Sequence, residues 1–413
     1  MSQVSFWWLA AGGFLHGLIA VCSLVSGLQL TWDKNQHMNR EFLRDKVLGC
    51  VIGASIGDSI GGPLEMATAE RVRETLDGRE WIDEMLLYRR PAGAHGVWQD
   101  DPPKGTGTDD TRYNQIFLET VCKHRSAVNS RQLAEAYIDR YRNVETFYPA
   151  YVALAREQLR PWYARACGHL GVVADDYPEI PVHVLNSDCF WGGFPVIAGL
   201  LALASAGLLW AGEPLQAYSH TFELAFCDLG YAKDATALMA AMVAMALEGS
   251  VAPKDIARSA VEINPYAALL DGFTGRQMTK RLQGLLALAD QTRDDRALMM
   301  ALASACSGLH VFDPVDVLNV PMTIIYHTDA DPVRSILMAA NHRLLNAEGE
   351  LLQLRDTDCV AYVTGALVGA MRGLNAFPQD WVEAVIAANE SVYGFNIMRN
   401  AEAFWKTVYG ERT

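Results

Sequence analysis

Residues 48–62 read LGCVIGASIGDSIGG and residues 361–374 read AYVTGALVGAMRGL, and in both stretches glycine recurs at every fourth position. The two rows consist of Gly49, Gly53, Gly57 and Gly61 in the first stretch and Gly365, Gly369 and Gly373 in the second. Residues four apart share one face of an α-helix. Because each glycine costs a helix roughly 1 kcal/mol relative to alanine, the rows indicate helices whose glycine face another backbone approaches closely.

Helical patterns also predominate in the rest of the chain beyond residue 40. In the clearest segments, apolar residues recur at helical spacing or fill the whole stretch; these segments are residues 131–142, 238–247, 379–389 and 401–409. Ser130 is the expected N-cap of the first of them. Alternating patterns are scarce, and only short runs such as Val320–His327 are candidate strands. The sequence therefore predicts an all-α fold, with one large domain over residues 41–413.

The composition excludes several classes of protein. Lys and Arg total 34 and Asp and Glu total 48, a net charge of −14, so binding of nucleic acid through a basic face is not expected. The chain is 51% hydrophobic and 20% charged, which excludes wholesale disorder. Eight cysteines form no CxxC pair. We therefore expect free thiols and a cytoplasmic catalytic domain, since reducing compartments keep cysteines unpaired.

Residues 1–40 are expected to form an apolar N-terminal extension. From Val4 to Leu30 the chain carries no charge, and this length could span a bilayer. Four interpretations stay open: a membrane anchor, a signal sequence, a buried helix, and a translation artefact with the natural start at Met38. An anchor or a signal would imply membrane contact through residues 4–30 or secretion.

Acidic residues cluster beside the glycine rows. In GDSIGGPLE (residues 57–65), the Gly-Gly-Pro run ends the helix and leaves Glu65 on a loop. TDDT (residues 108–111) and DTDC (residues 356–359) each precede a predicted helix. These residues could be N-caps. However, a cap needs one side chain, and four neighbouring aspartates without cations would be strongly unfavourable. Carboxylate and hydroxyl oxygens suit Mg²⁺ or Mn²⁺, although spacing alone does not show that the segments meet.

Taken in order, GASIGDSIGGPLE, GTDDT and DTDCVAYVTGALVGAMRGLNAFPQDW resemble the ADP-ribosylglycohydrolase family. That family includes the dinitrogenase reductase-activating glycohydrolase and the animal ADP-ribosylarginine and ADP-ribosylserine hydrolases. The resemblance covers roughly residues 46–395. It implies a single multi-helix orthogonal bundle with two divalent cations, Mg²⁺ or Mn²⁺, in a central cleft.

The resemblance also implies roles for individual residues. The implied metal ligands are Thr108, Asp109, Asp110, Asp356 and Asp358, with Cys359 in the position where many members carry a ligating threonine. Glu65 would be the catalytic acid or base, and Asp58 would orient the residues around it. Because a thiol is a poor partner for Mg²⁺, the second cation would be bound more weakly or through water.

The implied activity is hydrolysis of the bond at the anomeric carbon of ADP-ribose, in a monomer acting on a modified protein side chain or a small molecule. The leaving group stays open between arginine, serine and a small alcohol or amine. Where the family often has an Asn-Gly-x-x-Met-Arg loop, residues 187–195 read SDCFWGGFP.

The candidate substrate-binding residues in that loop are Phe190, Trp191, Gly192 and Gly193. Trp98, Phe190 and Trp191 could stack on the adenine, although ordinary core or rim packing is the favoured explanation for each of them. The altered loop and Cys359 support one alternative function: a catalytically lapsed member that binds ADP-ribose or a protein partner without turnover.

Overall fold

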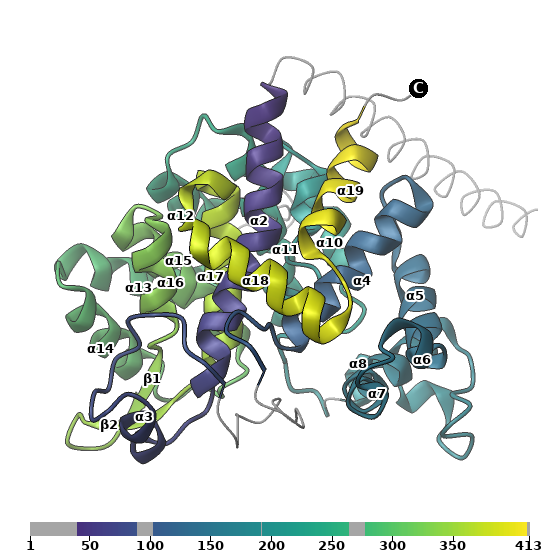
Figure 1. The fold of residues 1–413 in the computed structure, drawn as a ribbon, viewed down its shortest axis with the longest axis horizontal. Coiled ribbons are helices and arrows are strands. Elements are labelled where there is room, and N and C mark those ends of the chain that lie inside the picture. The colour runs from purple at the N-terminus through teal and green to yellow at the C-terminus, as the bar shows by residue number, and fades with distance from the viewer. Residues whose placement is uncertain (1–38, 89–101, 191, 264–276, 411–413) are drawn as a thin grey trace, which may run out of the picture.

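The computed structural model describes residues 39–88, 102–190, 192–263 and 277–410 (Figure 1). The α-helices of this part of the chain are α2 (Arg40–Gly61), α3 (Ala69–Thr75), α4 (Asp109–His124), α5 (Ser130–Arg142), α6 (Val144–Phe147), α7 (Val152–Leu170), α8 (Ser187–Phe190), α9 (Ala198–Ala202), α10 (Pro214–Leu224), α11 (Tyr231–Glu248), α12 (Pro253–Glu262), α13 (Gln277–Gln291), α14 (Asp295–Ala305), α15 (Val320–Thr328), α16 (Pro332–Ala339), α17 (Thr357–Arg372), α18 (Gln379–Tyr393) and α19 (Ile397–Tyr409). The prediction of an all-α fold is confirmed.

Shorter elements connect these helices. They are the 3₁₀ turns η1 (Gly62–Leu64), η2 (Val182–Val184), η3 (Ala206–Leu209) and η5 (Leu374–Ala376), and the π-helical turn η4 (Val315–Asn319). Among the described residues, β1 (Arg343–Leu345) and β2 (Leu351–Leu354) form one antiparallel hairpin with a bulge, in which Arg343 lies opposite Leu354. This hairpin leads directly into α17.

The centre of the fold is the antiparallel pair α2 and α17, which touch through their glycine faces (Figure 1). A Cβ atom added at any glycine of the first row would lie within 3.0 Å of the backbone of α17. The facing positions are Gly49 with Gly369, Gly53 with Gly365, Gly57 with Ala361 and Gly61 with Thr357. Because the helices run in opposite directions, the C-terminal end of α2 meets the N-terminal end of α17.

Helix α2 is both apolar and internal. Among the described residues, the segment Arg40–Leu64, with a mean hydropathy of 1.4, is long and apolar enough to cross a membrane, but its apolar stretch is entirely buried inside the protein. Its start is fixed by Asn39, whose side chain accepts hydrogen bonds from the backbone of Glu41 and Phe42. The burial identifies α2 as a core helix of this fold.

The other helices enclose this pair. Helices α4, α11, α18 and α19 contact α2, while α11, α15 and α16 contact α17. In Figure 1, α4, α5 and α7 lie on one side of α2, and α12 to α16 lie on the other. The prediction that residues 238–247 form a buried helix is confirmed, since they lie within α11.

Two local predictions were wrong. Val320–His327, a candidate strand, lies in helix α15, where the hydroxyls of Thr323 and Thr328 each donate to the carbonyl four residues earlier. A short apolar run does not distinguish a strand from a buried helix. The cap of α5 is Asn129 rather than Ser130, because Asn129 Oδ1 accepts a hydrogen bond from Gln132 N at 2.9 Å and Gln132 Oε1 accepts one from Asn129 N at 2.9 Å.

We predict that Gly365→Ala destabilises the protein by about 1–3 kcal/mol, because the new methyl group would press on the backbone oxygen of Gly53, which cannot rotate away. Urea denaturation would measure the change. The matched control is Gly284→Ala in α13, an exposed position with nothing within 4 Å of an added Cβ. This control should stabilise by about 0.5–1 kcal/mol. Equal stability of Gly365→Ala and wild type would show that the helices can separate at little cost.

The predicted N-terminal extension, with residues 4–30 and Met38, lies outside the described residues. We predict that a chain starting at Met38 folds with an unchanged melting temperature, because the cap of α2 and both glycine rows lie downstream. Thermal melts of the truncated and full-length chains would compare the two. Failure of the short chain to fold, with a stable full-length chain, would instead indicate a core helix within residues 4–30.

Candidate active site

The start of α17 carries two of the acidic residues singled out from the sequence. Asp356 occupies the N-cap position of α17, immediately after the hairpin, and Asp358 lies in its first turn. Both side chains are buried. The backbone N–H of Cys359 donates to Asp358 Oδ1 at 2.8 Å. The helix N-terminus, whose dipole favours negative charge, therefore presents two carboxylates at one place.

Glu65 reaches the same place from the end of α2. It directly follows the turn η1, and two contacts fasten its loop to the segment that precedes α17. Met66 N donates to the backbone oxygen of Arg355 at 3.1 Å. The hydroxyl of Thr357 donates to the backbone oxygen of Gly61 at 2.9 Å. The close approach of the two helices and these bonds together set the position of Glu65.

The third acidic segment, at the start of α4, is held by Asp58 of α2. Asp58 Oδ2 accepts hydrogen bonds from Thr108 N at 2.8 Å, from Thr111 N at 3.2 Å and from the Thr111 hydroxyl at 2.6 Å. Thr108 caps α4, since its hydroxyl accepts from Asp110 N at 3.3 Å. Asp58 thus fixes the first turn of α4, which carries Asp109 and Asp110.

The three segments meet in space, which their spacing in the sequence could not show. Carboxylate oxygens of Glu65, Asp356 and Asp358 lie within 4.8 Å of one another. The same limit holds for ligand atoms of Asp110, Asp358 and Cys359. We call the first set the oxygen group and the second the mixed group. Asp358 belongs to both, so the two groups form one continuous cluster.

This cluster has the properties of a cation site. Asp110 Oδ2 and Asp356 Oδ2 are buried and accept no hydrogen bond from any described residue. A buried polar atom without a partner is costly, and divalent cations bound at the two groups would satisfy these oxygens. Several converging carboxylates are also the donor set that hard divalent ions take in proteins. The residues present therefore fit the cations that the sequence resemblance implies.

Burial dominates the electrostatics of the cluster. It raises the pKa of Glu65, Asp110 and Asp356 well above their ordinary values, and the charge of Asp358 raises each pKa further. For Asp58, burial and then the charge of Asp358 raise the pKa to about 7. Without a compensating cation, these carboxyl groups hold protons at a pH at which exposed ones would have lost them.

A buried ionic network lies behind Asp356. Asp316, in the turn η4, accepts hydrogen bonds from His342 Nε2 at 2.7 Å and from Arg355 Nε. All three side chains are fully buried. Although burial opposes it, His342 and Arg355 keep the pKa of Asp316 below its ordinary value. Arg355 Nη2 also donates to the backbone oxygens of residues 309–310, so the network joins the start of α17 to a wall of the cavity.

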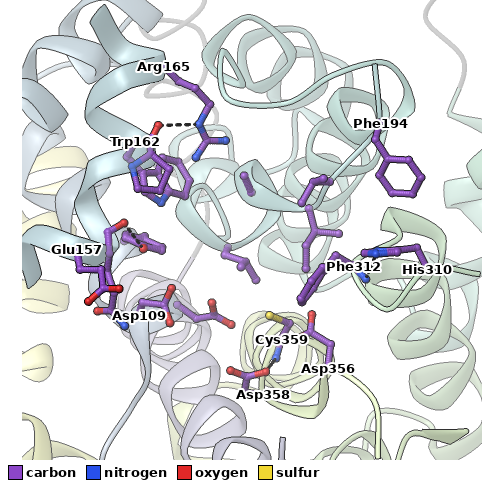
Figure 2. Close-up of a pocket in the computed structure, with 18 of the residues that line it drawn as sticks. Asp109, Glu157, Trp162, Arg165, Phe194, His310, Phe312, Asp356, Asp358 and Cys359 are labelled. Atoms are coloured by element: carbon purple, nitrogen blue, oxygen red, sulfur yellow. Dashed lines mark hydrogen bonds between the residues drawn. The ribbon is translucent and has the colours of Figure 1, made fainter. Parts of the chain in front are cut away.

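The cluster opens into a cavity of about 620 Å³ (Figure 2). Asp356, Asp358 and Cys359 lie together at one side of it, and the half-buried Asp109 lies across from them. Aromatic rings line the other walls: Tyr113, Trp162, Phe194, His310 and Phe312. A cavity of this size, mostly apolar with a few converging polar groups, is typical of a small-molecule site.

Sequence comparison assigns this architecture to a known family. The family model described as ADP-ribosylglycohydrolase matches residues 39–406. The chain belongs to the ADP-ribosylglycohydrolase family. A solved structure described as an ADP-ribosylglycohydrolase-related protein complex is also similar, with a TM-score of 0.54 and 18% sequence identity over 89% of this chain and 99% of that chain. At that identity the likeness shows the fold alone. A search of curated proteins found no match.

The substrate-binding residues that the sequence resemblance implies are only partly described. The side chain of Phe190, and the whole of Trp191 and Trp98, lie outside the described residues. Gly192 and Gly193 are exposed and are not among the described residues that line the cavity. Their role in substrate binding stays a prediction.

The cavity lining of the ADP-ribosylglycohydrolase fold includes residues that the sequence did not single out. Phe194, the next residue of the SDCFWGGFP segment, lines the cavity, and its ring lies 5.0 Å from that of His310. On another wall, the rings of Tyr113 and Trp162 are 4.6 Å apart. No motif marks these rings, because they come from distant parts of the chain. Among these rings, only Phe194 could have been suggested by the sequence, because it directly follows the candidate substrate-binding residues of the SDCFWGGFP segment.

Without cations, the stability of the protein should fall as pH rises. The folded pKa values of Glu65, Asp110 and Asp356 lie above the unfolded ones, so their contribution is complete below about pH 4 and is lost as pH rises through the folded values. In EDTA we expect the melting temperature to drop as the pH rises above about 4. Added Mn²⁺ should restore it, with a larger gain at higher pH.

Matched variants assign this effect to the cluster. Asp358→Asn alters the residue shared by both groups and should abolish most of the stabilisation by Mn²⁺. Asp228→Asn is the control, because Asp228 is equally buried but binds Gly199 N and the Thr236 hydroxyl instead. The control should keep the Mn²⁺ response despite a lower overall stability. A melting temperature that ignores Mn²⁺ at every pH would contradict cation binding.

Proposed function

We propose that this protein is a metal-dependent hydrolase that cleaves the bond at the anomeric carbon of an ADP-ribosyl group. Its substrate would be an ADP-ribosylated protein or a small molecule that carries ADP-ribose. The observation that carries the proposal is the convergence of acidic residues from α2, α4 and α17 at the side of one cavity. Membership in the family supports the hydrolase class.

The cluster offers the ligands for two divalent cations, Mg²⁺ or Mn²⁺. Asp110, Asp356 and Asp358 of the cluster would hold them, and Thr108 and Asp109, which adjoin Asp110 at the start of α4, would complete the set. When bound, such cations polarise substrate oxygens and lower the pKa of water. Asp58 would keep the first turn of α4 in position through its three hydrogen bonds. The Asp316 network would do the same for Arg355 and the start of α17.

Glu65 is our candidate for proton transfer. Hydrolysis adds a water oxygen to the anomeric carbon and returns a proton to the leaving nitrogen or oxygen, so one group must accept or donate that proton. Burial and the neighbouring carboxylates raise the pKa of Glu65, which helps this carboxyl group to hold a proton that it can donate. Its carboxylate lies beside Asp356 and Asp358, although Glu65 is not among the described residues that line the cavity.

The rest of the cavity suits the remainder of an ADP-ribosyl group. The rings of Phe194, His310 and Phe312 form one series, with centroids 5.0 and 5.3 Å apart, on the wall away from Asp109 (Figure 2). Aromatic faces accept a stacked base. We propose this wall for the adenine, with the ribose next to the reacting bond directed toward the acidic cluster.

We also propose that the enzyme acts in the cytoplasm as a monomer, unless residues 4–30 attach it to a membrane. All cysteines among the described residues are free, and five of the seven are buried, which suits a reducing compartment. The net charge of −14 disfavours direct contact with nucleic acid.

Release of ADP-ribose tests the proposed function directly. Peptides carrying ADP-ribosyl-arginine or ADP-ribosyl-serine would be incubated with the purified protein and Mn²⁺, with EDTA as the control. We expect free ADP-ribose from at least one peptide, only in the presence of the cation. Binding of ADP-ribose with no release from either peptide would favour the catalytically lapsed alternative instead.

Glu65→Gln should lower turnover on the order of 10²-fold or more, because the amide can no longer exchange the proton. The variant keeps an oxygen donor in the same position, so cation affinity should fall far less than activity. Turnover and a Mn²⁺ binding isotherm would be measured on the same preparation. Unchanged turnover would remove Glu65 from the mechanism, and an equal loss of both would make it a cation ligand.

A further inference from the structure

The oxygen group and the mixed group share Asp358, and only the mixed group contains a donor atom that is not oxygen. Every donor of the oxygen group is a carboxylate oxygen, whereas the mixed group combines two carboxylates with the sulfur of Cys359. Cys359 lies in the first turn of α17 and its side chain is 6% exposed. The cluster therefore provides two neighbouring positions of different chemistry that share Asp358.

The sulfur of Cys359 faces the same space as the carboxylates. Cys359 lines the cavity, and Figure 2 shows its sulfur on the cavity side of α17, close to Asp356 and Asp358. Across from it, Asp110 is 2% exposed, and its Oδ2 accepts no hydrogen bond from the described residues. A buried carboxylate oxygen that needs a positive partner thus lies in the same group as the thiol, which distinguishes this place from ordinary packing around a buried cysteine.

Ligand type decides which cation each position prefers. Carboxylate oxygens suit hard ions such as Mg²⁺ and Mn²⁺, whereas thiolates select softer ones such as Zn²⁺. Zinc accepts cysteine sulfur and carboxylate oxygen together. We propose that the cluster binds two different cations: a hard ion at the Asp356 and Asp358 carboxylates of the oxygen group, beside Glu65, and a softer, zinc-like ion at the mixed group, with Cys359 as a thiolate ligand. This inference rests on the metal dependence proposed above.

Binding of a cation at the mixed group exchanges the thiol proton of Cys359 for the cation. The S–H bond of Cys359 breaks, a bond forms between its sulfur and the cation, and one proton passes to the solvent. No atom is oxidised or reduced. Magnesium does not drive this exchange, because it demands oxygen ligands and gives up its water reluctantly.

Cobalt(II) is the probe, because a sulfur ligand gives it a charge-transfer band in the near ultraviolet that oxygen ligands do not give. The full chain, reduced and kept free of oxygen, would be titrated with Co²⁺ in the presence of Mg²⁺. We expect the band in the wild type. Cys359→Ser should lose the band while still binding Co²⁺. Cys189→Ser, which removes an exposed thiol, should keep it.

Competition between Zn²⁺ and Mg²⁺ for a second variant tests the same ligand independently. Cys359→Thr restores the hydroxyl that many family members carry at this position. Its ratio of Zn²⁺ to Mg²⁺ affinity should fall on the order of tenfold or more, because only the soft ion loses its preferred ligand. The affinity for Mg²⁺ alone should stay the same or rise.

The outcomes separate this inference from the function on which it rests. Wild-type protein that binds Co²⁺ without the band, or a Zn²⁺ to Mg²⁺ ratio that Cys359→Thr leaves unchanged, would overturn the thiolate ligand but not the metal dependence. Failure of the wild type to bind Co²⁺, Zn²⁺ or Mg²⁺ would contradict the metal dependence itself. If Cys359→Ser does not fold, the wild-type band and the Cys359→Thr ratio decide the question.

Discussion

The close backbone contact between α2 and α17 is the constraint on which the rest of the structure depends. Side chains larger than hydrogen are excluded from most of the shared face, so the two helices approach until their backbones touch. Their antiparallel direction then has a chemical consequence. It places the loop after α2, with Glu65, against the first turn of α17, with Asp356 and Asp358. A packing rule for two helices thereby positions acidic groups that lie almost three hundred residues apart in the sequence.

The buried carboxylates of this region do two different things. Asp58 and Asp316 are anchors: Asp58 Oδ2 fixes the start of α4, and Asp316 binds His342 and Arg355. Asp110 Oδ2 and Asp356 Oδ2, and the second oxygen of Asp58 as well, have no hydrogen-bond partner among the described residues. The hydrogen bonds of Asp58 and Asp316 hold the surroundings of the cluster rigid. Burying the unpaired carboxylate oxygens inside the cluster, in contrast, lowers the stability of the fold. A stable fold around such groups is consistent with a site that is completed by cations.

The cavity is assembled differently from the cluster. Its aromatic walls come from α4, α7 and the segments near residues 194 and 310, which surround the central pair and are not parts of it. Arg355 connects the two regions, because its guanidinium binds Asp316 on one side and the backbone of residues 309–310 on another. The acidic cluster and the cavity walls are therefore built from different parts of the chain and are joined through Arg355.

The sequence by itself determined the features that depend on local spacing. Helical periodicity predicted the all-α fold, the glycine rows marked close helix contacts, and the ordered acidic motifs indicated both the family and the segments of the site. Spacing could not show that the two rows pack against each other, that Asp358 belongs to two donor groups, or that Asp316 holds Arg355. It also misread residues 320–327, because a buried helix and a buried strand are equally apolar. These features were decided by tertiary structure, since burial, unsatisfied oxygens and cavity walls exist only when distant segments exclude water together.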